Sequence, residues 1–203
     1  MSATRISVFP LGGALLFPRM HLPLHIFEPR YRAMVSDALA RDRRIGMVQP
    51  RDASDTPALF EIGCLGKIIE VETHDDGRFD LILEGVARFA IRRELEVTTP
   101  FRQVEAELIE NGEPEILSLA ERSSIEMEAR RFADAHGYAV DWEGVSRLDD
   151  ESLVNGIAQI APFDIASKQA LLESNALRER ADLVIQLMQF FGRYGEDDIG
   201  TLQ

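Results

Sequence analysis

A proline-broken apolar stretch near the start of the chain limits the folds that this sequence can adopt. Residues 9–39 read FPLGGALLFPRMHLPLHIFEPRYRAMVSDAL, with Pro10, Pro18 and Pro23 at short intervals. Because proline fixes φ and lacks a backbone donor, no continuous helix can pass through the first half of this stretch. The apolar residues between the prolines therefore predict short extended segments that cross a core, with prolines at strand edges or ends.

The hydrophobic period changes after Glu28. Pro29 suits the first turn of a helix, and apolar residues then recur at helical spacing. The sequence predicts one amphipathic helix from Glu28 to about Arg41.

Short segments of β character continue to residue 108. The expected strands cover residues 5–9, 44–49, 59–74, 79–84, 86–99 and the alternating positions around Val104, Ala106 and Leu108. Asp76–Gly77 predicts a hairpin turn, Gly85 predicts a further turn, and Gly63 with Gly66 predicts a bulge or a close backbone approach. About seven short strands with one helix among them predict a closed or half-closed β-barrel.

The second half of the chain changes to helical periodicity. The first expected helix runs from Pro114 to about Ala135 and is closed by Gly137. Its expected apolar faces consist of Ile116, Leu117, Ala120, Ile125, Met127 and Phe132. Later helices start at Asp149 or Asp150, Asp164 and Asn175, with Pro162 ending the second. The last has a bundle-type stripe of Leu177, Ala181, Val184, Met188 and Phe191. The predicted fold class is α+β: a β-rich subdomain at 1–111, an α-helical bundle at 112–195 and an acidic tail at 196–203.

Charge and cysteine content restrict the partners and the compartment. The formal net charge is −13, whereas nucleic-acid binding needs a basic face that displaces counterions from phosphates. The single cysteine, Cys64, excludes an internal disulfide and fits a reducing compartment. No signal pattern and no membrane-spanning apolar run occurs in the sequence, so we expect a cytoplasmic protein that binds neither nucleic acid nor membranes.

No set of residues in the sequence predicts catalysis. His21, His25 and Glu28 suggest zinc ligands, but Pro23 prevents a helix there, and an extended chain would place the two histidines about 13 Å apart. His74 is assigned to the hairpin turn and Cys64 to an inert buried thiol. We therefore expect no catalytic residues, no metal and no cofactor.

Several segments in order resemble the N-terminal domain of Lon proteases. They are the stretch quoted above, RIGMVQP, EIGCLGKI, LEGVARF and LVNGIAQIAPFDIASKQALLESNALRERADLVIQLM. The proline pattern, Glu28-Pro29-x-Tyr31, Gly63/Gly66 and Gly85-x-x-Arg88 carry the resemblance, which covers roughly residues 5 to 195. It implies a PUA-like β-barrel followed by helices, in a module for substrate recognition and protein interaction.

The resemblance does not extend to the ATPase and protease parts of Lon. Neither Lys67, followed by Ile68, nor Lys168, preceded by Ser167, fits a P-loop. We expect a free-standing, non-catalytic peptide- or protein-binding module, an adaptor or regulator of proteolysis. Its partners would be unfolded or peptide-like clients, or Lon itself.

The candidate contact surface lies where the irregular segment meets the helix. Its residues are Pro18, Met20, Phe27, Glu28 and Arg30. Two alternatives stay open at this point. The apolar members of the set can simply fill the core, and the barrel can instead bind a small ligand or RNA, as PUA-like folds do elsewhere.

Overall fold

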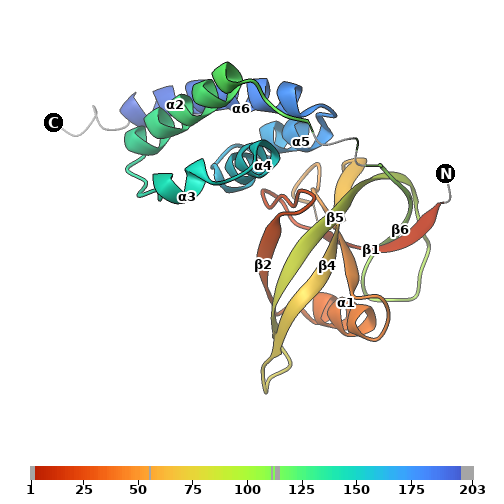
Figure 1. Cartoon of the computed structure of the whole chain (residues 1–203). Helices are drawn as coiled ribbons and strands as arrows, with labels where there is room; N and C mark the ends of the chain where they lie inside the picture. The colour runs from red at the N-terminus through yellow and green to blue at the C-terminus, as the bar shows by residue number, and fades with distance from the viewer. Residues whose placement is uncertain (1–2, 55, 111, 113–114, 198–203) are drawn as a thin grey trace. The chain divides into compact units, whose positions relative to one another are not determined.

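The computed structural model of the chain describes residues 3–54, 56–110, 112 and 115–197. Two compact units divide the chain, residues 1–111, here called the β unit, and residues 112–203, the helical unit (Figure 1). The expected tail begins inside the last helix, which runs to Asp197, and the rest of it, 198–203, lies outside the described residues.

The described residues of the β unit form six strands and one helix, where the sequence suggested about seven strands. In chain order they are β1 (Thr4–Pro10), β2 (His21–Ile26), α1 (Pro29–Leu39), β3 (Arg44–Val48), β4 (Ile62–Thr73), β5 (Phe79–Glu94) and β6 (Gln103–Leu108). Pro29 begins α1 as predicted, and the buried face of the helix consists of Tyr31, Met34, Val35 and Ala38.

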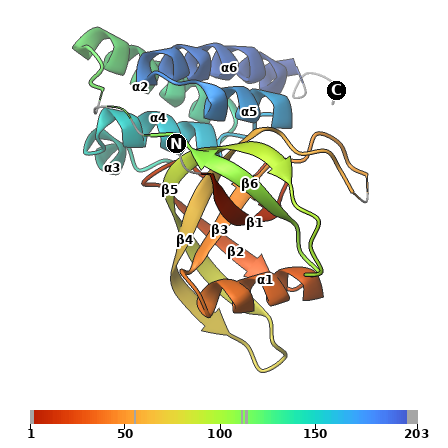
Figure 2. The same cartoon turned by 90° about the vertical axis from the view of Figure 1, so that its right-hand side faces the viewer.

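Five of the strands pair in a closed ring. The strand order is β2-β5-β4-β3-β1-β6, and β5 also pairs with β6, so that the sheet closes on itself (Figure 2). Only the β1–β3 pair is parallel among the described strand pairings. Buried side chains that cluster together from these strands are Ile6, Val8, Val48, Leu65, Phe89, Val104 and Ala106. β2 lies outside the ring and, among the described strands, pairs with β5 alone.

Gly85 does not form the turn that the sequence suggested. β5 continues through it, and the proline-rich segment comes so close to β5 at this point that only glycine fits. A Cβ on Gly85 would lie 1.9 Å from the backbone oxygen of Phe17. Arg19 N donates to Gly85 O at 2.8 Å, and Gly85 N donates to Met20 O at 2.8 Å, which fixes the proline-rich segment against β5.

The other glycine signals agree with the predictions. Gly77 has φ +81° in the β4–β5 hairpin, and its backbone N donates to His74 O at 2.8 Å. The pairing of β4 with β5 shifts register between Leu65 and Gly66.

In the part of the helical unit that the structure describes, there is one helix more than expected. Its helices are α2 (Leu119–Ala135), α3 (Trp142–Ser146), α4 (Asp150–Ile160), α5 (Ile165–Glu173) and α6 (Leu177–Asp197). α6 packs against α2, α4 and α5, and the predicted stripe is buried at Leu177, Ala181, Val184 and Met188. Asp149 and Asp164 cap α4 and α5 as predicted. No helix in the described part of the chain combines the length and apolarity needed to cross a membrane.

Two helix starts differ from the predictions. α2 begins at Leu119, because Ser118 and Glu121 form a reciprocal capping box there; Pro114 itself lies outside the described residues. α6 begins at Leu177 rather than directly after Asn175, and its first backbone N–H donates to the Glu115 carboxylate at 3.1 Å.

The predicted apolar faces of the first helical segment are also partly wrong. Ile116 precedes α2 and is 84% exposed, and Met127 within the helix is 61% exposed. The face that packs contains Ile125, Ala129 and Phe132, at the spacing of one helix face. Met127 lies off this face and therefore projects into solvent.

Candidate functional site

Three of the five candidate contact residues lie together at the junction between β2 and α1. The Phe27 side chain is 59% exposed, directly after β2 ends. Arg30 in the first turn of α1 forms an ion pair with Glu28 at 2.9 Å. The Arg30 guanidinium also lies 4.6 Å from the centroid of the buried Tyr31 ring. An aromatic side chain and a charged pair therefore share one exposed surface.

The other two candidates lie at the opposite end of β2. Pro18 is buried, and Met20 is half-buried next to the backbone contact with Gly85. Phe27 lies seven positions beyond Met20, which corresponds to about 23 Å of extended chain. Pro18 offers no accessible ring to a partner, and the structure does not unite the five residues in one site.

The outer edge of β2 runs from Met20 at one end of the strand to Phe27 at the other. Met20 O accepts from Gly85 N, so backbone polar groups at even-numbered positions of β2 point toward β5 and those at odd-numbered positions point away. Pro23, which lacks an N–H, occupies an outward position, in agreement with the prediction that prolines lie at strand edges. An edge of this kind can pair with an extended peptide in the part of the strand that follows Pro23.

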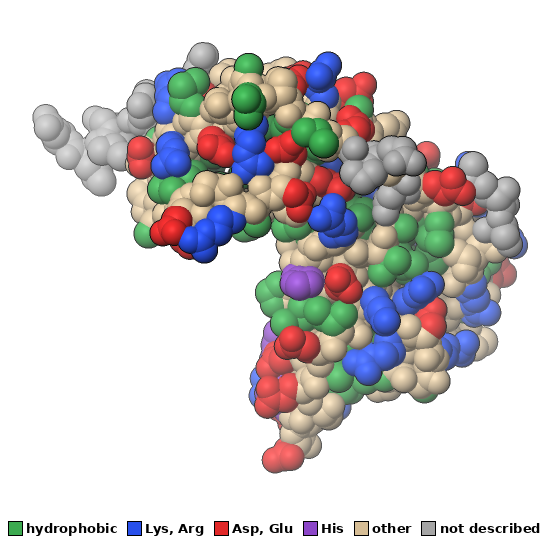
Figure 3. Space-filling view, in the orientation of Figure 1, with side chains coloured by type: hydrophobic (Ala, Val, Ile, Leu, Met, Phe, Trp, Pro, Cys, Tyr) green, Lys and Arg blue, Asp and Glu red, His purple; other side chains and the backbone are tan. Residues whose placement is uncertain are grey.

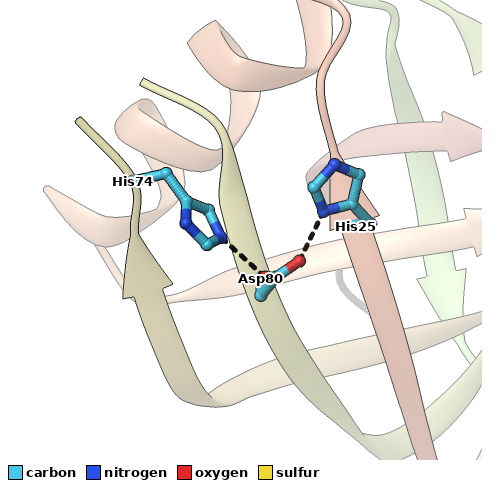
Figure 4. A group of neighbouring side chains, drawn as sticks. All are labelled: His25, His74 and Asp80. Carbon is cyan, nitrogen blue, oxygen red and sulfur yellow. Dashed lines mark hydrogen bonds and ion pairs between the residues drawn. The ribbon is translucent and has the colours of Figure 1, made fainter. Parts of the chain in front are cut away.

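A cluster of three polar side chains, which the sequence did not predict, lies on the sheet near this edge. His25 Nδ1 is 2.5 Å from Asp80 Oδ1, and His74 Nε2 is 2.6 Å from Asp80 Oδ2 (Figure 4). These hydrogen bonds from the two rings lower the pKa of the Asp80 carboxyl. The His25 ring also stacks with the Phe27 ring, with centroids 6.1 Å apart.

Strand pairing explains why the sequence did not reveal this cluster. The sequence predicted that His21 and His25 lie too far apart along an extended chain to share a metal ion. Their places in β2 agree with this, because His21 lies opposite Glu84 and His25 opposite Asp80. His74, however, is 49 positions beyond His25 in the numbering, and only the β2–β5–β4 register brings the two together. The only available signal was the placement of His74 and Asp80 on either side of the predicted hairpin turn.

The helical unit has an apolar groove of its own. It has a volume of about 790 Å³ and lies between the end of α2, α3 and α4. Its lining includes Phe132, Tyr138, Trp142, Val145 and Ile160, of which Tyr138 is 49% and Ile160 82% exposed. Exposed apolar groups in a concave surface are suited to bind apolar side chains.

Cys64 is expected to stay unmodified when the native protein is treated with iodoacetamide at pH 8. Its side chain is fully buried, and burial raises the pKa of the thiol to about 12. The reactive thiolate is then only about one part in 10⁴ of the population. Mass spectrometry should show alkylation only after denaturation, and rapid modification of the native chain would contradict the buried placement.

The chain matches the family model described as the ATP-dependent protease La (LON) substrate-binding domain over residues 5–189. It is 25% identical to the Lon protease of Buchnera aphidicola over 195 residues, which cover 91% of this chain and 25% of that protein. The chain thus spans about a quarter of the length of the curated relatives it matches.

Two solved structures resemble the fold. One is the crystal structure of a Lon N-terminal domain protein from Xanthomonas campestris, with a TM-score of 0.68, 19% identity, and coverage of 90% of this chain and 98% of that one. The other is the N-terminal domain of the Mycobacterium avium complex Lon protease, with a TM-score of 0.67, 20% identity, and coverage of 92% and 98%. Both likenesses cover 90% or more of this chain, and they support the mixed α+β fold described above.

Proposed function

The chain belongs to the family of Lon substrate-binding domains, and from this premise we propose that it binds extended, partly apolar segments of client proteins. Membership of the family supports a role in substrate recognition. We propose further that the closed strand ring is a PUA-like barrel, and that the protein acts in the cytoplasm as a non-catalytic adaptor or regulator of proteolysis. Lon itself is then a candidate partner besides the clients.

The observation that carries this proposal is the surface at the end of β2. Phe27 offers an exposed aromatic ring, and Glu28 and Arg30 offer charges of both signs beside it. The outward edge of β2 supplies backbone groups for an extended peptide. An apolar anchor beside a strand edge suits unfolded chains, because backbone pairing is independent of the client's sequence. Phe27, Glu28 and Arg30 are therefore the proposed contact residues.

The arginines of the β unit give little support to RNA binding. Arg92 and Arg93 on β5 form ion pairs with Glu107 and Glu105 on β6. The hydrogen bond between Arg92 and Glu107 raises the pKa of the arginine and lowers the pKa of the glutamate. Each side chain therefore stabilises the charge of the other. Figure 3 shows acidic side chains among the basic ones on its face of the molecule. To reach Arg92 and Arg93, phosphate groups of RNA would have to displace the carboxylates of Glu107 and Glu105.

We expect Phe27→Ser to weaken binding of a permanently unfolded client at least fivefold. The loss of an aromatic anchor commonly removes about 1 kcal/mol or more, which corresponds to this factor. Fluorescence anisotropy with a labelled, reduced and alkylated protein chain measures the affinity. Phe190→Ser is the matched control, since Phe190 is exposed to a similar extent, 54%, on α6 of the helical unit. Circular dichroism confirms that both variants fold.

A second pair of variants tests the groove of the helical unit. Ile160→Asp changes the groove, and Leu119→Asp changes an equally exposed leucine that is outside the groove lining. A loss of affinity for Ile160→Asp alone, with Phe27→Ser unchanged, would move the client site to the groove and overturn the assignment to β2. Absence of client binding by the unmodified chain, with salt-sensitive RNA binding instead, would overturn the proposed function.

A further inference from the structure

The face of the sheet that carries His25, His74 and Asp80 brings three metal-ligating groups together. His25 and Asp80 are direct cross-strand neighbours, and Asp80 is likewise opposite Glu72 on β4. His74 follows Glu72 by two positions, so its side chain lies on the same face. One nitrogen of each ring and a carboxylate oxygen all lie within 4.8 Å of one another.

We propose that His25 Nδ1, His74 Nε2 and an Asp80 carboxylate oxygen bind one zinc ion or a chemically similar divalent transition metal. Imidazole nitrogen and carboxylate oxygen are both zinc ligands, and three protein ligands leave a fourth tetrahedral position for water. This site does not depend on the proposed client binding. The sequence did not predict it, because His25 and His74 are 49 positions apart and only the strand register joins them.

The geometry needs only small side-chain movements to accept the ion. Ligand atoms around a tetrahedral zinc lie roughly 3.3 Å apart, given bond lengths of about 2.0–2.1 Å. The two nitrogen–oxygen distances, 2.5 Å and 2.6 Å, would have to lengthen by less than about 1 Å. The two side chains of the shorter contact are each 47% exposed and that of His74 31%, so they can turn without disturbing a core. Strand pairing meanwhile holds the backbones of His25 and Asp80 in place, and His74 N donates to Arg78 O at 2.9 Å in the hairpin.

The charges around the cluster are compatible with a cation. Glu70 and Glu72 of β4 line the same shallow hollow as His25 and Asp80. Arg78 is the basic group in contact: its Nη1 lies 3.4 Å from His25 Nε2, the ring nitrogen that does not ligate. That guanidinium is already paired with Asp76 at 2.6 Å. Arg78 alone therefore does not neutralise the negative charge of Glu70, Glu72 and Asp80, and a cation can do so.

Isothermal titration of the full, untagged chain with Zn²⁺ in a metal-free, non-chelating buffer tests the proposal. We expect one ion per chain at micromolar concentrations, and at least tenfold weaker binding for His25→Gln, His74→Gln and Asp80→Asn individually. His21→Gln is the matched control, because His21 is exposed on the same strand but lies opposite Glu84. Its affinity should equal that of the unmodified chain. Cobalt bound at the site should give the visible absorption of a four-coordinate ion.

Thermal unfolding supplies a readout that separates this site from adventitious binding. Saturating zinc should raise the melting temperature of the unmodified chain, chelation should reverse the rise, and His74→Gln should abolish it. The proposal is wrong if the unmodified chain binds no zinc up to about ten times the expected concentrations. The proposal would also be refuted if His25→Gln and His74→Gln bound zinc as tightly as the unmodified chain. A loss of zinc affinity in His21→Gln as large as that in the ligand variants would refute it too. In each of these cases the three side chains form only a hydrogen-bonded cluster.

Discussion

Replacing Gly85 with alanine is expected to destabilise the β unit by about 3 kcal/mol or more. The added Cβ would lie 1.9 Å from Phe17 O, and that oxygen is backbone, so it cannot turn aside as a flexible side chain does. Relief of the clash requires the proline-rich segment that contains Phe17 to move away from β5. The movement would break the hydrogen bonds of Gly85 with Arg19 and Met20, each with a net value of about 1 kcal/mol.

Hydrogen exchange of β2 and β5 amides, combined with denaturant unfolding followed by circular dichroism, measures the effect. Gly112→Ala is the control, because a Cβ built on Gly112 has no neighbour within 4 Å. We expect the control to unfold like the unmodified chain. A Gly85→Ala variant within about 0.5 kcal/mol of the unmodified chain would contradict the close approach. Gly85→Ala should also lose client binding, because the displaced segment around Phe17 leads directly into β2.

Replacing Arg180 with leucine is expected to destabilise the helical unit by about 3 kcal/mol or more. Arg180 is 6% exposed and joins three helical segments. Its Nη1 donates to Asn155 Oδ1 at 2.9 Å, Nε to Leu171 O at 3.2 Å and Nη2 to Ser174 O at 2.8 Å. Leucine would fill part of the volume but would leave these acceptors without their donors, and a buried unsatisfied acceptor costs about 1–3 kcal/mol.

The single tryptophan, Trp142, lies in α3 and lets fluorescence follow the unfolding of this unit alone. Arg178→Leu provides a matched control on the same helix. Arg178 pairs with Glu121 at 2.6 Å, but its side chain is 66% exposed, so its loss should cost less than about 1 kcal/mol. Arg180→Lys should resemble Arg180→Leu, because an ammonium group cannot reach three acceptors with the guanidinium's planar geometry. Equal effects of the Arg178 and Arg180 changes would refute this interpretation.

The end of β2 combines the two proposed sites. His25 contributes to the candidate metal cluster and stacks with Phe27, the proposed anchor for client chains. The two proposals are nevertheless separable by mutation, because His74 and Asp80 contact the metal position without being part of the contact surface. Client affinity of His74→Gln, measured with and without zinc, shows whether an ion at His25 alters the neighbouring aromatic surface.

Local signals predicted the elements of the β unit well where one residue type decides the backbone. Prolines excluded a helix before residue 28 and predicted extended segments with prolines at strand edges or ends, and Asp76–Gly77 predicted the hairpin. The same reasoning failed at Gly85, because a glycine that allows a turn and a glycine that allows close packing look alike in sequence. Caps predicted the starts of α4 and α5, whereas the start of α6 depends on Glu115, which is 62 positions from Leu177.

The sequence by itself determined the α+β class, the order of the β and helical parts, the absence of a helix before residue 28 and the resemblance to Lon N-terminal domains. These properties depend on proline and glycine chemistry, on hydrophobic period and on residue order, all of which are local or one-dimensional. Only the tertiary structure decided that Phe27 is exposed while Pro18 is buried, that Arg180 rather than Arg178 is buried, and that His25, His74 and Asp80 converge. Burial and convergence depend on strand register and helix packing between distant segments, and the spacing of residues along the chain does not carry that information.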